Sequence, residues 1–73
     1  MKLSNYIEIR SDKRFGKPVL KGTRISVSDV LNWLANGMTK EEIVEDFPEV
    51  TFDAIKACLL YASSKEHRIG IAS

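Results

Sequence analysis

Cysteine and histidine are almost absent from this chain, which contains one of each among its 73 residues. Cys58 has no second cysteine with which to form an internal disulfide, and His67 has no cysteine or second histidine at metal-ligand spacing. No serine or cysteine is therefore accompanied by a histidine base in the pattern that nucleophilic catalysis needs. The glycines also lack the Walker spacing that cradles nucleotide phosphates. We expect no enzymatic activity, no metal and no cofactor.

Long apolar runs are lacking as well, and the sequence has no signal-peptide core. Together with the single unpaired cysteine, this favours a cytoplasmic protein without membrane attachment. A chain of this length has room for one domain, over residues 1–73. Because a core of this size gains stability from pairing, we expect a homodimer.

Charge is unevenly distributed, although the whole chain has a net charge of +1. Residues 1–25 contain seven Lys or Arg and two acidic residues, a net charge of +5. Residues 26–73 contain four Lys or Arg and eight acidic residues, a net charge of −4. This division predicts that the basic part contacts a polyanion, and nucleic acid is the favoured interpretation. The alternative is that the basic part of one copy pairs with the acidic helices of another.

A short β-hairpin is predicted in the basic part. Residues 6–10 alternate apolar and polar side chains, and residues 18–20 are apolar with a proline at the start. The polar residues 11–16 form the loop between these strands, and Gly22 allows the turn that follows them. These segments form a β arm over 5–25. Because a two-stranded ribbon alone is marginally stable in water, the arm must rest on the helices or on another subunit.

The first helix begins at Ser26 or Ser28, either of which can cap it, and ends before Gly37. Asp29 in its first turn is favourably placed at the positive end of the helix dipole. Trp33 is interpreted as a residue at the edge of the core, and the alternative is an exposed anchor for a partner. A helical period is kept by its apolar residues Val27, Val30, Leu31, Leu34 and Ala35.

Two further helices follow, separated by a tight turn. Thr39 begins a capping box with the glutamate three residues later, Pro48 ends the second helix, and Thr51 caps the third. The spacing is that of a helix-turn-helix, so we expect a mainly α fold with a three-helix bundle over 26–66 and a tail over 67–73. The inward residues are Ile43, Val44 and Phe47 in the second helix, and Ile55, Cys58, Leu59 and Ala62 in the third.

Basic residues of the arm are the leading candidates for contact with DNA. Arg24 has two interpretations: it reaches a phosphate or a base edge, or its planar guanidinium pairs with Asp29 or Glu42 inside the fold, and the internal pair is favoured. The flexible and solvated side chains expected to contact phosphates are Lys13, Arg14, Lys17 and Lys21.

The beginning of the third helix offers fewer groups suited to DNA. Thr51 and Lys56 are able to contact a phosphate or a base edge, but phosphate repels Asp53, which lies between them. If DNA is bound, the arm must therefore carry more of the contact than is usual for a helix-turn-helix protein.

Two sequence blocks resemble those of a family of small prokaryotic proteins, the domain of unknown function 433 family. The first block contains Gly16-Lys17-Pro18, Lys21-Gly22-Thr23-Arg24-Ile25 and Val27. Further matches are Asn36-Gly37, Glu42-Ile43, Phe47-Pro48, Val50-Thr51, Ile55, Ala57 and Tyr61-Ala62. The resemblance covers residues 5–62 and implies a homeodomain-like bundle of three helices preceded by a short β element.

The resemblance also implies a function. Many such proteins are considered antitoxins, encoded beside a small PIN-like nuclease toxin. By this resemblance, the chain is expected to regulate transcription of a toxin–antitoxin pair, binding DNA as a dimer and neutralising the nuclease. The alternative is a protein-interaction or oligomerisation module that does not bind DNA.

Overall fold

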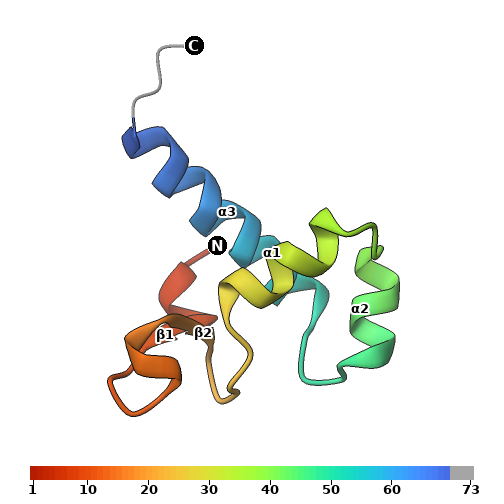
Figure 1. Cartoon of the computed structure of the whole chain (residues 1–73), viewed down its shortest axis with the longest axis horizontal. Coiled ribbons are helices and arrows are strands. Elements are labelled where there is room, and N and C mark those ends of the chain that lie inside the picture. Colours follow the sequence, from red (N-terminus) through yellow and green to blue (C-terminus); the bar gives the residue numbers. More distant parts are fainter. Residues whose placement is uncertain (70–73) are drawn as a thin grey trace.

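Within residues 1–69, which the computed structural model describes, three helices follow a two-stranded antiparallel hairpin (Figure 1). This arrangement confirms the predicted fold class. Two single 3₁₀ turns, η1 (Leu3–Asn5) and η2 (Arg14–Gly16), precede the two strands. The strands and helices are β1 (Ile7–Ile9), β2 (Pro18–Leu20), α1 (Val27–Ala35), α2 (Lys40–Asp46) and α3 (Phe52–Ile69).

The hairpin is attached to the bundle by apolar packing and by backbone hydrogen bonds. Ile7 of β1 lies opposite Leu20 of β2, and both side chains are buried. The backbone N–H of Leu20 donates to the carbonyl oxygen of Ile25 at 2.8 Å. Val19 also forms a β-bridge with Ser26, the residue before α1. The hairpin therefore rests on the helices, one of the two supports expected from the sequence.

The capping residue of α1 is Ser26, one of the two serines predicted for this position. The backbone N–H of Asp29 donates to Ser26 Oγ at 3.0 Å, and the Ser26 N–H donates to Asp29 Oδ2 at 3.0 Å. These reciprocal bonds satisfy two backbone donors that a helix start otherwise leaves free. Ser28 lies inside the helix, with its hydroxyl oxygen 3.0 Å from Ser26 Oγ.

The caps of α2 and α3 also lie where the sequence predicts them. Thr39 Oγ1 accepts from the Glu42 N–H at 3.1 Å, and Glu42 Oε1 accepts from the Thr39 N–H at 2.8 Å. α2 ends before Pro48. Thr51 Oγ1 accepts from the Ala54 N–H at 3.0 Å and so caps α3. The end of α2 before Pro48 and the cap at Thr51 together define the turn between α2 and α3.

The third helix is longer than the sequence analysis predicted. α3 continues to Ile69, past the predicted start of the tail at residue 67, and its later turns project beyond the rest of the domain (Figure 1). The physical reason is the lack of a helix breaker before Gly70, because Ser63 and the charged residues after it are tolerated in a helix. The remainder of the predicted tail, residues 70–73, lies outside the described residues.

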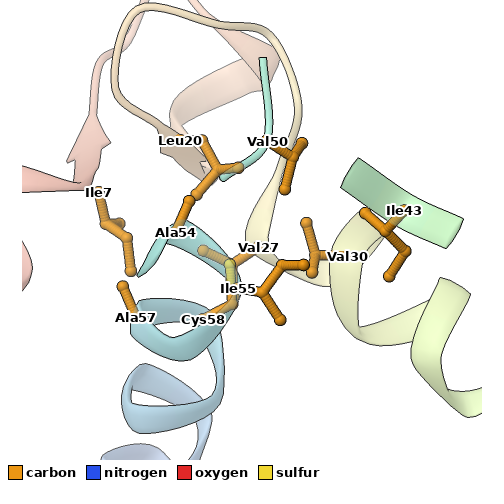
Figure 2. Packing of buried hydrophobic residues seen from close by; sticks show 10 residues of the cluster. All are labelled: Ile7, Leu20, Val27, Val30, Ile43, Val50, Ala54, Ile55, Ala57 and Cys58. Atoms are coloured by element: carbon orange, nitrogen blue, oxygen red, sulfur yellow. The ribbon is translucent and has the colours of Figure 1, made fainter. Parts of the chain in front are cut away.

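The core is formed where α3 meets the hairpin, α1 and the residues around α2 (Figure 2). Ile55 and Cys58 of α3 are buried as predicted, whereas Leu59 is 50% exposed, so its predicted core position is wrong. The buried face of α3 instead includes Ala54 and Ala57, whose small side chains allow close approach of the hairpin and α1. The residues of this cluster are Ile7, Leu20, Val27, Val30, Ile43, Val50, Ala54, Ile55, Ala57 and Cys58.

Trp33 and Phe47 close the edge of the core between α1 and the end of α2. Their rings are stacked, with centroids 4.1 Å apart and planes inclined by 6°. Both side chains are partly buried against the core cluster. This confirms the interpretation of Trp33 as a residue at the edge of the core.

Cys58 is expected to react slowly with thiol reagents in the folded protein. Its side chain is fully buried, and burial raises the pKa of the thiol from 9.0 to about 11. Because the thiolate is the reactive form, both effects protect the residue. Labelling with a chromogenic disulfide at mildly alkaline pH should be slow in buffer and fast in concentrated urea. Equally fast labelling in both conditions would contradict the burial.

Candidate nucleic-acid interface

The loop between β1 and β2 is connected to the turn that follows β2. Glu8 Oε2 accepts from the backbone N–H of Gly22 at 3.1 Å and from Lys13 Nζ at 3.3 Å. The Gly22 hydrogen bond is the main cause that lowers the pKa of Glu8, and Lys13 lowers it further. Gly22 has a φ of 78°, as its predicted role in the turn requires. One carboxylate therefore joins two basic segments that are distant in the sequence.

Arg14 makes the internal ion pair that the sequence analysis assigned to Arg24. Arg14 Nη1 donates to the carbonyl oxygen of Arg24 at 2.8 Å and to Asp29 Oδ2 at 2.9 Å. The Arg24 side chain is exposed and pairs with neither predicted carboxylate, Asp29 nor Glu42. The favoured prediction for Arg24 is therefore wrong. The Arg14 side chain connects the loop to the start of α1, and Arg24 contributes only its backbone carbonyl oxygen to this connection.

The Asp29 carboxylate has two roles: it closes the capping box of α1, and it binds Arg14 of the loop between β1 and β2. Partial burial raises the pKa of its carboxyl group, but the hydrogen bonds from Ser26 and Arg14 outweigh this effect. The pKa of Asp29 is consequently below its ordinary value of 3.8. The charged carboxylate is the form that holds both the helix start and the loop.

Internal ion pairs divide the predicted phosphate contacts into two groups. Lys13 and Arg14 pair with acidic groups of the fold, and Arg10 forms a further exposed pair with Asp12. Lys13 and Arg14 thus form the first, paired group. The residues of the second group are exposed and have no ion-pair partner among the side chains of residues 1–64. Its members are Lys17, Lys21 and Arg24, which we call the free cations of the arm.

The solvent-facing side of α3 includes three large apolar side chains. Phe52, Leu59 and Leu60 are all exposed there, at 51%, 50% and 43%. The predicted contact Lys56 is exposed on the same side, at helical spacing from these residues. The hydroxyl of Thr51, also predicted to contact DNA, accepts the capping bond of α3. This face therefore offers few groups for reading base edges: between residues 52 and 64 it has one exposed cation, Lys56, whereas the arm has three without an ion-pair partner.

Phe15 is a candidate functional residue that the sequence analysis missed. Its side chain is 100% exposed, although large apolar side chains are usually at least partly covered. It lies in η2, where Arg14, Phe15 and Gly16 have φ values of 49°, 58° and 80°. Left-handed backbone costs a residue other than glycine roughly 1 to 3 kcal/mol. The signal in the sequence was an aromatic residue between arginine and glycine in a polar loop.

Neither a metal site nor a membrane span is formed by the described part of the chain. No group of three His, Cys, Asp or Glu side chains is placed there to hold a metal ion. None of the helices between residues 1 and 69 is long and apolar enough to cross a membrane.

The fold and the arm define a small three-helix domain with a basic N-terminal hairpin. Residues 7–62 match the family model described as a protein of unknown function, DUF433, and the chain belongs to this family. It is similar to the crystal structure of a DUF433 member protein from Anabaena variabilis. The sequences are 24% identical, and the match covers 93% of this chain and 67% of the other. The TM-score of 0.81 shows that the two share a fold. A search of curated proteins gave no match.

Proposed function

We propose that this protein is the DNA-binding antitoxin of a toxin–antitoxin pair, which binds DNA as a dimer and neutralises a PIN-like nuclease. The observation that carries the DNA-binding part is the set of free cations, Lys17, Lys21 and Arg24, on an arm whose two carboxylates are both paired. Glu8 is held by Lys13 and Gly22, and Asp12 by Arg10. The arm therefore presents uncompensated positive charge.

The contact is expected to be mainly with phosphates. Lysine and arginine side chains that neutralise phosphates release counterions, and this supplies much of the affinity of DNA-binding proteins. Lys56 on α3 is a further exposed cation, three residues after Asp53, whose carboxylate repels phosphates. Such an arrangement favours positioning on the DNA backbone over base recognition by α3.

Binding to a duplex from the protein's own promoter is expected to weaken steeply with salt. Replacing Lys17, Lys21 or Arg24 singly with alanine should reduce the slope of log affinity against log salt by about 0.9 for each phosphate that is no longer neutralised. Fluorescence anisotropy over a range of salt concentrations measures this slope. Lys40→Ala is the matched control, because it removes an exposed cation from α2 and should leave the slope nearly unchanged. If the wild type does not bind at low salt, DNA binding is excluded.

The exposed apolar side of α3 supports the nuclease-binding part of the proposal. Phe52, Leu59 and Leu60 form a surface suited to being covered by a protein partner. Copurification from the native host, followed by a ribonuclease assay with and without the chain, tests this part. Leu59→Ser should release the nuclease and restore its activity. Glu45→Ser, on the exposed side of α2, serves as the control.

The second candidate function is a protein-interaction or oligomerisation module without DNA binding. The same apolar side of α3, together with the acidic Asp53, is the observation that favours it. Light scattering of the purified protein determines whether the chain forms dimers. Release of a dimer by Leu59→Ser, in a protein that binds no promoter DNA, would establish this alternative.

A further inference from the structure

We propose that Phe15 is a wedge that inserts between stacked bases of the DNA held by the arm. This inference rests on the proposed function, because it requires that the arm binds DNA. The proposal adds two features to the phosphate contacts. The arm makes an apolar contact with the bases through Phe15, and this contact bends the duplex.

The first observation is the conformation of the loop. Phe15 is completely exposed, and it is presented by three consecutive residues with left-handed backbone, two of which are not glycine. Such backbone persists only where the surroundings enforce it, and it is concentrated at functional positions. Folding of this domain gains no burial from the Phe15 side chain.

The second observation is that the loop is fixed on both sides of Phe15. Arg14 is bonded to the Arg24 carbonyl and to Asp29, and Lys13 is bonded to Glu8. The backbone N–H of Gly16 also donates to the Lys13 carbonyl oxygen at 3.0 Å. A preorganised loop loses little conformational entropy on binding, so an exposed aromatic ring there is suited to insertion.

The third observation is the charge of the surroundings. Lys17 follows Phe15 by two residues, and Arg14 brings the turn that contains Arg24 to the same loop. The nearby carboxylates Glu8 and Asp29 are already paired. An aromatic ring among free cations matches a ligand that offers both phosphates and stacked bases. Proteins that kink DNA use this combination, with basic residues on the backbone and an apolar wedge between base steps.

Affinity and bending of a promoter duplex test the wedge. Phe15→Ala is expected to weaken binding by roughly tenfold or more, since each aromatic–base stack contributes substantially to affinity. The salt slope should stay the same, because no charge changes. Energy transfer between dyes at the two ends of the duplex should report a bend with the wild type and a smaller bend with Phe15→Ala. Phe15→Leu keeps a large apolar side chain and should retain most of the bend.

Lys17→Ala is the matched control, with the opposite signature: a lower salt slope and a retained bend. Thermal unfolding followed by circular dichroism should show all three variants folded, because both side chains are exposed. Wild-type affinity and bending in Phe15→Ala would overturn the wedge, while salt-dependent binding would still support the proposed function. Weaker binding with an unchanged bend would also overturn insertion.

Two further outcomes distinguish failure of the wedge from failure of the proposed function. If the wild type does not bind the duplex, the wedge and the DNA-binding function are both overturned. If Phe15→Ala binds DNA normally but no longer self-associates in light scattering, Phe15 is an anchor for a second copy, and the wedge is overturned in favour of a protein contact.

Discussion

Replacing Ile43 with alanine is expected to lower the free energy of unfolding by about 3 kcal/mol, because truncating a buried isoleucine removes apolar contacts and leaves a cavity. Ile43 is the largest of the fully buried side chains and the residue through which α2 enters the core. Native domains are stable by only about 5 to 15 kcal/mol, so this loss is a large part of the total. Urea unfolding followed by far-ultraviolet circular dichroism measures the change.

Glu45→Ala is the control for this prediction. Glu45 is exposed on the same helix, so its replacement should leave stability nearly unchanged. If Ile43→Ala unfolds at the same urea concentration as Glu45→Ala, the result would contradict the burial of Ile43 in the core. A loss confined to Ile43→Ala would show that α2 is an integral part of the core.

Asp29→Ala is expected to destabilise the domain by about 1 to 2 kcal/mol, the sum of a lost helix cap and a partly exposed ion pair. The substitution removes the acceptor for both the Ser26 N–H and Arg14 Nη1. Asp29→Asn keeps a side-chain oxygen but loses the charge, so it should retain most of the cap and weaken the attachment of the loop. Thermal unfolding distinguishes the two variants. Equal stability of Asp29→Ala and wild type would contradict the capping geometry.

The same carboxylate predicts a dependence of stability on pH. The pKa of Asp29 is lower in the folded protein than its ordinary value of 3.8, so the unfolded state binds the proton more readily. The stabilisation is therefore complete above this ordinary value and is lost as the pH falls through the lower, folded-state pKa. In Asp29→Ala this contribution is absent, and the decline of stability in acid should be shallower than in the wild type.

Local rules predicted most of the secondary structure from the sequence. Ser26, Thr39 and Thr51 cap their helices because their hydroxyl oxygens satisfy backbone donors within three residues. Gly22 turns the chain because glycine adopts positive φ without a steric penalty. Such features depend on short segments, and the sequence contains all the information they require.

The errors arose where distant segments meet. Arg14, which pairs with Asp29, has the left-handed backbone that residues other than glycine ordinarily avoid, and no local sequence pattern indicates this pairing over fifteen residues. Helical periodicity alone put Leu59 in the core. The face of α3 that is buried depends on how the hairpin and α1 pack on it. Phe15 stands out in the sequence as an aromatic residue in a polar loop, but its complete exposure depends on the conformation of that loop.

The Arg14 bridge makes the loop and the first turn of α1 one cooperative unit. Its guanidinium is bonded to the Arg24 carbonyl and to the carboxylate that closes the capping box of the helix. If the loop opens, the Asp29 carboxylate therefore loses its bond to Arg14, and this carboxylate is the group that closes the capping box at the start of α1. Conversely, a ligand that immobilises the loop also suppresses fraying of α1. The tip of the arm is in this way connected to the backbone of the bundle.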